Sequence, residues 1–194
     1  MSKNKTTQNV SGKAKPFTVK QLAFSAAAVA LATVLSLITL FSYPTGGSIT
    51  PLSMLVICLP GFWFGPVVGI CAATAYGLLQ LLIDPYILFP AQLIMDYFLA
   101  FGVMGLSGLF TNAKHGLMKG YFTAVLGRYF FASLSGFLFF AEYAWEGWNP
   151  ILYSFAYNAT YIFTEAAITV VVLLLPPVHK AMLRIKQEAV GKNF

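Results

Sequence analysis

The sequence predicts an all-α integral membrane protein with six transmembrane helices and both termini in the cytoplasm. Hydrophobic residues make up 58% of its 194 residues and charged residues only 9%, whereas about a quarter is usual in soluble domains. The apolar runs are long enough to cross a bilayer as helices, and they lack the period-two alternation of a transmembrane barrel. The positive charges lie in segments that can share one side of a membrane, which fits the positive-inside rule.

Six apolar segments are separated by breaks that contain Pro, Gly or charged residues. The first segment is too long for the apolar part of a cleaved signal peptide, so we expect an uncleaved helix. The second is short, and Gly65-Pro66 leaves room only for a tight turn before the third. We predict spans over residues 17–42, 51–64, 66–83, 88–110, 119–141 and 151–175.

The basic residues predict the orientation of these spans. Apart from Arg128, the twelve Lys and Arg residues fall in three groups. Five lie before the first apolar run or at its start, up to Lys20; Lys114 and Lys119 lie around the loop between the fourth and fifth spans; and the others follow the last span. Positive charge is retained in the cytoplasm, and an even number of spans returns the chain to the same side. The external loops, 43–50, 84–88 and 142–150, then carry only acidic charges.

This topology divides the chain into three regions. The basic residues of the two terminal regions are explained by the positive-inside rule, without a nucleic-acid partner. We predict a basic cytoplasmic N-terminal tail over residues 1–16, a six-helix membrane domain over 17–178 and a basic cytoplasmic C-terminal tail over 179–194.

A carboxylate, Asp96, lies inside the apolar run of the predicted fourth span. Such a charge is costly in lipid unless it faces protein, water or a ligand. Phe89 and Gln92 share its helical face by their spacing of three and four. Arg128 and Glu165 lie at similar depths on the fifth and sixth spans, and we interpret them as a buried pair with each other. Asp96 is therefore expected to take its partner from outside the chain.

The outer halves of the fifth and sixth spans add polar and aromatic groups. By helical rise, Asp96 and Asn158 both lie roughly 10 Å below the outer surface. Serines among these groups are interpreted as hydrogen-bonding contacts between helices. The sixth-span residues follow a four-three-four spacing along one helical face: Ser154, Asn158, Tyr161 and Glu165. The fifth span contributes Ser133, Ser135, Gly136 and Phe140.

These groups suit a small, aromatic, cationic solute that enters from outside. Aromatic rings attract cations, and a carboxylate can accept two hydrogen bonds from one planar ligand. The aromatic residues expected near Asp96 are Tyr86, Tyr97, Phe140 and Tyr153.

No motif in the chain predicts an enzyme. The sequence lacks HExxH, GxSxG and a Walker A loop, and Cys58 and Cys71 are interpreted as packing residues without a metal. Two other classes remain open from the residues alone. One is a small proton-coupled transporter or channel that uses Asp96 and Glu165 as relay carboxylates, and the other is a scaffolding membrane protein whose polar groups only join helices.

From about Gln21 to Pro176 the chain resembles a family, the thiamine-specific S-components of the energy-coupling factor (ECF) transporters in the bacterial plasma membrane. The segments that carry the resemblance are LAFSAAAVA, PTGGS, QLIMDYFLAFGVMGLSG and EYAWEGWNPILYSFAYNATY. The resemblance implies a six-helix fold with an outer thiamine pocket that the first external loop covers. It implies that Asp96 meets the aminopyrimidine, and that the ligand is surrounded by Tyr86, Gly136, Phe140, Tyr153 and Asn158.

The resemblance also implies partners. Ala23 and Ala27 form an AxxxA surface that docks a membrane coupling protein, and two separate ATPases use the ATP, so the chain itself needs no cofactor. The chain has Asp96 where the family usually has Glu, Ala132 where a His is expected, and Phe140 where Trp is common. A related pyrimidine, thiazole or pyridine vitamin precursor is therefore the alternative ligand.

Overall fold

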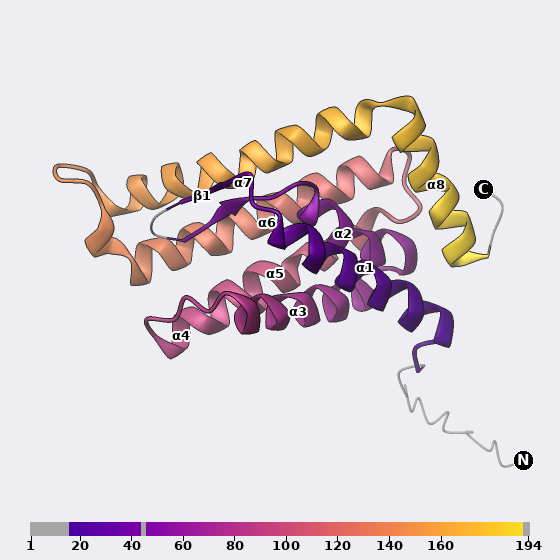
Figure 1. Ribbon diagram of the computed structural model, residues 1–194, viewed down its shortest axis with the longest axis horizontal. Coiled ribbons are helices and arrows are strands. Elements are labelled where there is room, and N and C mark those ends of the chain that lie inside the picture. Colours follow the sequence, from indigo (N-terminus) through magenta and orange to yellow (C-terminus); the bar gives the residue numbers. More distant parts are fainter. Residues whose placement is uncertain (1–15, 44–45, 192–194) are drawn as a thin grey trace, which may run out of the picture.

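The computed structural model describes residues 16–43 and 46–191, which form a bundle of helices with one short hairpin against it (Figure 1). Residues 1–15, most of the predicted N-terminal tail, lie outside the described residues. The helices are α1 (Val19–Leu37), α2 (Ser53–Phe64), α3 (Pro66–Ile83), α4 (Pro90–Leu93), the π-helix η1 (Ile94–Leu99), α5 (Ala100–Gly102), the 3-10 helix η2 (Val103–Phe110), α6 (Gly116–Phe139), the 3-10 helix η3 (Ala141–Tyr143), α7 (Pro150–Leu174) and α8 (Pro176–Val190). The antiparallel strands are β1 (Phe41–Ser42) and β2 (Ser48–Ile49).

Five helical stretches of the described chain are long and apolar enough to cross a membrane, which confirms a membrane-type helical fold. They are Val19–Leu37, Pro66–Ile83, Pro90–Phe110, Gly116–Phe139 and Pro150–Leu174. The predicted second span corresponds to α2, which has only 12 residues, fewer than the roughly 20 that a perpendicular span needs.

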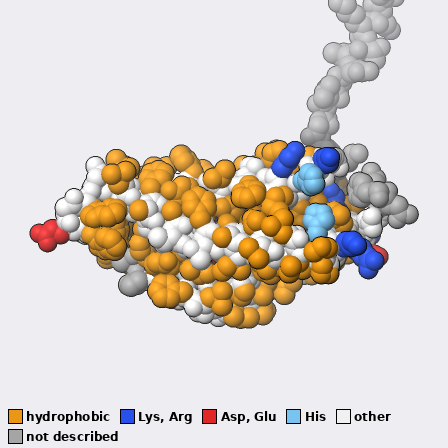
Figure 2. Space-filling model, turned by 90° about the horizontal axis from the view of Figure 1, so that it is seen from above, with side chains coloured by type: hydrophobic (Ala, Val, Ile, Leu, Met, Phe, Trp, Pro, Cys, Tyr) orange, Lys and Arg blue, Asp and Glu red, His pale blue; other side chains and the backbone are white. Residues whose placement is uncertain are grey.

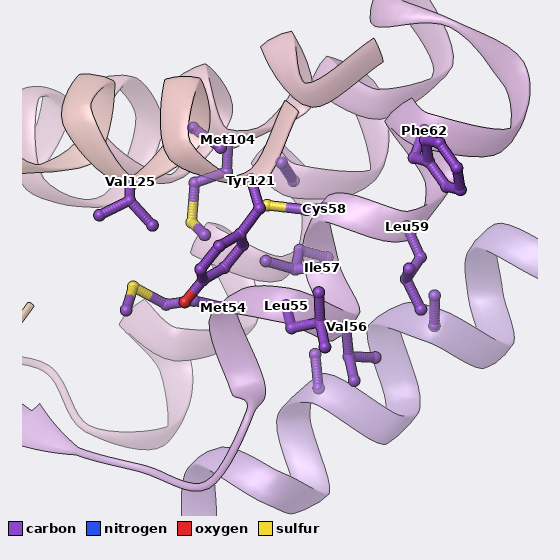
Figure 3. Packing of buried hydrophobic residues seen from close by; sticks show 14 of the residues in the cluster. Met54, Leu55, Val56, Ile57, Cys58, Leu59, Phe62, Met104, Tyr121 and Val125 are labelled. Atoms are coloured by element: carbon purple, nitrogen blue, oxygen red, sulfur yellow. The ribbon is translucent and has the colours of Figure 1, made fainter. Parts of the chain in front are cut away.

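Helix α2 forms the centre of the core. All its residues except Phe64 are buried, as expected for a helix that is hydrophobic on every side. Figure 3 shows Met54, Ile57 and Cys58 of α2 facing Met104 of η2 and Tyr121 of α6, with Val125 alongside. The short helix is therefore surrounded by the longer ones, and its position sets where the preceding hairpin meets the bundle.

Small residues allow α2, α3 and η2 to pack backbone against backbone. A Cβ added at Gly69 would lie 2.5 Å from Gly61 Cα and 2.6 Å from the Gly105 carbonyl oxygen. Gly77 likewise lies against the Tyr97 carbonyl, where a Cβ would approach to 2.0 Å. Such close helix contacts are typical of membrane bundles, and here they hold the stretch Pro90–Phe110 against α3.

Basic groups gather at one end of the molecule. Figure 2 shows Lys, Arg and His side chains at one end of the visible face, and hydrophobic side chains along its length. The described basic residues at this end lie at the start of α1, before and at the start of α6, and in α8: Lys20, Lys114, Lys119, Lys180, Arg184 and Lys186.

Helix α8 is a difference from the predicted division of the chain. The boundary expected after residue 178 falls inside this helix, which packs on α7, α2 and α1. Lys186 is buried, donates a hydrogen bond to the Thr111 carbonyl and lies 4.0 Å from the centre of the Phe62 ring. Burial lowers the pKa of Lys186 below its usual range. The region expected to be a tail therefore begins as part of the bundle.

Candidate functional site

A cavity of about 210 Å³ lies between the stretch Pro90–Phe110, α6 and α7, beside the β1–β2 hairpin. This volume is several times the roughly 30 Å³ that one water molecule occupies in the liquid. The structure brings all seven residues predicted to bind the ligand around this cavity: Tyr86, Asp96, Tyr97, Gly136, Phe140, Tyr153 and Asn158. Their contact with a ligand remains a prediction.

Asp96 lies on a π-helix and not on the regular helix predicted over residues 88–110. In η1 (Ile94–Leu99) the backbone makes a wider turn, a feature that is frequent at functional sites. The continuation of this span is also irregular, since η2 is a 3-10 helix. Asp96 is partly buried and borders the cavity.

Asp96 has a hydrogen-bond partner within the chain, so the expectation that its partner comes only from outside was wrong. Gln92 Nε2 donates to Asp96 Oδ2 at 2.8 Å and to the Tyr86 carbonyl at 2.8 Å. Gln92 Oε1 accepts from the Leu88 N–H at 2.8 Å. This buried amide thus orients the carboxylate and ties it to the loop before α4, a role that the spacing of residues 92 and 96 indicated but did not assign.

Aromatic side chains form part of the cavity wall. The rings of Tyr86 and Phe140 are stacked, with centroids 5.7 Å apart and an angle of 18° between their planes. The ring of Tyr153 lies 5.6 Å from that of Trp145. Such rings can contact an apolar or cationic ring of a ligand.

Tyr97 braces the loop that precedes α4. Its hydroxyl accepts from the Tyr86 N–H at 2.9 Å and donates to the Asp84 carbonyl at 3.1 Å. The hydroxyl is therefore already engaged, and the part of Tyr97 that is available to a ligand is its ring.

On α7, Asn158 is held by two hydrogen bonds. Its Nδ2 donates to the Ser154 carbonyl at 2.9 Å, and its Oδ1 accepts from the Tyr161 hydroxyl at 2.6 Å. Ser154 Oγ donates to the Ser133 carbonyl of α6 at 2.7 Å, as expected for a serine that joins two helices. The side chains facing the cavity from α7 are therefore fixed before any ligand arrives.

Gly136 lets α6 approach these residues. A Cβ at this position would lie 2.2 Å from Ser154 Oγ and 3.2 Å from Asn158 Nδ2. We expect Gly136→Ala to lower ligand affinity about five- to a hundredfold, because the added methyl group must displace Asn158 or separate the helices, and such overpacking costs about 1–3 kcal/mol. Titration calorimetry of the purified variant checks this. Ala141→Gly, in the nearby η3, serves as the control, and equal affinity for wild type and Gly136→Ala would contradict the expected contact.

Arg128 was interpreted as the partner of Glu165, and this was wrong. In the described part of the chain no ion pair joins them. Arg128 borders the cavity, with its guanidinium carbon 4.4 Å from the centre of the Phe101 ring and its Nη1 3.9 Å from Met104 Sδ. The spacing of Arg128, Ala132 and Gly136, each four residues apart, places them on one face of α6 and could have identified Arg128 as a site residue.

The β1–β2 hairpin, which lies in the segment predicted to be the first external loop, forms part of the cavity wall. Gly46, Gly47 and Ser48 border the cavity. The Tyr157 hydroxyl donates to the Gly46 carbonyl at 2.7 Å, and the Tyr43 N–H donates to the Gly47 carbonyl at 2.9 Å. Gly47 has a φ of +88° and lies so close to the Tyr161 ring that a Cβ would approach within 2.7 Å. Only glycine fits this position without displacing the hairpin.

The cavity thus offers one guanidinium, several aromatic rings, the carboxylates of Asp84 and Asp96 and the amides of Gln80, Gln92 and Asn158. This set suits recognition of a planar polar ligand by hydrogen bonds and ring contacts. Among the residues that the structure describes, no group of three or more His, Cys, Asp and Glu residues is placed to hold a metal ion.

Comparisons with known proteins agree with one another. A family model described as thiamine transporter protein (Thia_YuaJ) matches residues 22–185. The chain is 32% identical over 148 residues to the thiamine transporter ThiT of Bacillus subtilis (strain 168), which covers 69% of this chain and 77% of that protein. The structure is similar to that of ThiT from Listeria monocytogenes, with a TM-score of 0.66 and 28% identity over 81% of this chain and 94% of the other. Residues 22–185, which the family model matches, include every residue that borders the cavity.

Proposed function

Because the chain belongs to the thiamine transporter protein family, and is therefore a multi-pass membrane protein of bacteria, we propose that it is a substrate-binding S-component that captures thiamine from outside the cell. Two partner ATPases then hydrolyse the ATP, and a membrane coupling protein connects them to this chain. The observation that carries the proposal is Asp96, oriented by Gln92 towards a cavity with aromatic walls. A carboxylate so placed can accept hydrogen bonds from the aminopyrimidine of thiamine.

The same proposal orients the protein in the membrane. We place the basic end, which carries Lys20, Lys114 and Lys180, in the cytoplasm, because cytoplasmic segments retain Lys and Arg. The hairpin and the cavity then face outward. Helix α2 and the five longer stretches together make up the six helices of the membrane domain, with α2 enclosed by the others.

Titration calorimetry of the purified protein tests the ligand. We expect thiamine to bind at least about a hundredfold more tightly than either its aminopyrimidine or its thiazole half, because each half forfeits the contacts of the other. Tighter binding of one half, or of a pyridine vitamin precursor, would reassign the ligand and leave the S-component proposal in place. Ala132 supports this second candidate, since it removes a side chain where the related S-components are expected to have a histidine.

Uptake in cells tests the transport class. We expect accumulation of labelled thiamine to require the coupling protein and both ATPases, and to persist when the proton gradient is collapsed while ATP is maintained. Uptake by the chain alone that follows the proton gradient would instead favour a proton-coupled transporter with Asp96 and Glu165 as relay groups.

A further inference from the structure

The carboxylate of Glu165 is fully engaged away from the ligand cavity. Glu165 is only 3% exposed, and it does not border the cavity. Its Oε2 accepts from the Thr50 N–H at 3.3 Å and from Thr50 Oγ1 at 2.8 Å, and its Oε1 accepts from Ser53 Oγ at 3.1 Å and from the Met54 N–H at 3.0 Å. Each oxygen thus meets one backbone N–H and one hydroxyl.

The four donors lie between the end of the hairpin and the first two residues of α2. Thr50 directly follows β2, and Ser53 is the first residue of α2. Between them Leu52 adopts a left-handed conformation with a φ of +63°, so the segment bends around the carboxylate. An anion at the N-terminus of a helix is also favoured by the helix dipole. Glu165 therefore fixes the base of the hairpin to α7.

The hairpin itself is held together as one unit. The Leu40 N–H donates to the Ile49 carbonyl at 2.8 Å, and Tyr43 pairs with Gly47. At the tip, the Tyr157 hydroxyl of α7 bonds the Gly46 carbonyl. The base is thus held by a buried carboxylate, and the tip by a hydroxyl at the rim of the cavity.

One face of α7 connects this base to the cavity. Asn158, Tyr161 and Glu165 are spaced by three and four residues, so they share a face. Asn158 borders the cavity, Tyr161 bonds Asn158 and supports Gly47 of the hairpin, and Glu165 holds the hairpin's base. A displacement of the hairpin's base would therefore change the positions of Tyr161 and Asn158.

We propose that Glu165 is a positioning residue for ligand capture, whose carboxylate is the fixed pivot that holds the base of the hairpin on α7 and so keeps Gly47 beside the cavity. The ligand part of this inference rests on the proposed function, whereas the pivot can be tested without a ligand.

Glu165→Gln is the informative variant. A carboxylate can accept from an N–H and a hydroxyl at both oxygens, but an amide can accept at only one end. Its NH₂ end must therefore face either the Thr50 or the Met54 N–H, and one of these buried donors loses its partner. The side chain keeps its size, so cavity formation does not complicate the result.

The accessibility of the hairpin is measured by alkylation of Ser48→Cys with a membrane-impermeant maleimide, in a Cys71→Ala background that leaves the buried Cys58. Without ligand, we expect Glu165→Gln to raise the labelling rate about tenfold, the effect of losing one or two buried hydrogen bonds. We also expect thiamine to dissociate about tenfold faster in stopped-flow fluorescence, with a smaller change in the association rate.

Thr169→Val is the matched control, because Thr169 lies one turn further along α7 and is fully buried, and the structure gives it no hydrogen bond to the hairpin. It should leave both rates unchanged. If Glu165→Gln does not fold, Thr50→Val and Ser53→Ala remove the hydroxyl donors from the other side and should each raise the labelling rate. Unchanged labelling in all three variants would overturn the pivot, as would equal rises in Thr169→Val. Failure of the wild-type protein to bind thiamine would refute the proposed function and leave the labelling result on the pivot intact.

Discussion

Replacing Asp96 with Asn is expected to weaken thiamine binding by about 1.5–3 kcal/mol, roughly ten- to a hundredfold in Kd, the usual loss for a hydrogen bond to a charged group. The variant keeps the shape of the side chain and can still accept from Gln92 Nε2 with its amide oxygen. Its NH₂ end would face the ligand's own donors, and the negative charge that favours a cationic ligand would be lost. Titration calorimetry at constant ionic strength measures the change.

Glu142→Gln is the matched control for Asp96→Asn. Glu142 is an exposed carboxylate in η3 that does not border the cavity, so its removal changes the net charge by the same amount and should leave the affinity within about twofold of wild type, since exposed charges contribute little. If Asp96→Asn bound thiamine as tightly as Glu142→Gln, Asp96 would not be a ligand contact. Thermal unfolding of both variants checks that the fold is retained.

Replacing Ala27 with Trp is expected to abolish thiamine uptake in cells while leaving thiamine affinity unchanged. Ala23, Ala26, Ala27 and Ala30 are all exposed on α1, whereas Ala28 and Ala32 face the core. A helix face of small residues lets another helix approach closely, and an indole at its centre would hold a coupling protein several ångströms away. Uptake of labelled thiamine is measured with the coupling protein and ATPases present.

The control for Ala27→Trp is Leu126→Trp on α6, where Leu126 is 56% exposed. It places the same indole on a different helix, and uptake should be retained. Normal uptake in Ala27→Trp would show that the coupling protein docks elsewhere. A parallel loss of binding and uptake would instead show that the substitution had damaged the fold.

Much of the helical layout could be predicted from the sequence, because local residues mark the ends of the helices. The predicted span 66–83 is the observed α3, bounded by Gly65-Pro66 and Asp84-Pro85. The π-helix and the 3-10 helix between Ile94 and Phe110 could not be predicted, because apolar periodicity does not separate them from an α-helix.

The candidate site was predictable where helical spacing alone places residues on one face, as for Asn158 on α7 and Asp96 with Gln92. It was not predictable where the partner is distant in sequence. Depth along a helix gave Arg128 and Glu165 the same level but could not say which way each side chain points. The donors to Glu165 lie more than a hundred positions earlier, at Thr50 and Ser53, in a loop whose path depends on the whole bundle.

Opposite charges on two walls of one cavity determine the orientation in which a ligand binds. Asp96 borders it from η1 and Arg128 from α6, so one wall attracts hydrogen-bond donors and the other attracts acceptors. A ligand with an amino group at one end and a ring nitrogen at the other is held one way round, because its reversed pose places donor against donor and acceptor against acceptor. A molecule with cationic groups at both ends is rejected whichever way it enters. Asp96 and Arg128 therefore select a ligand by the order of its polar groups as well as by its shape.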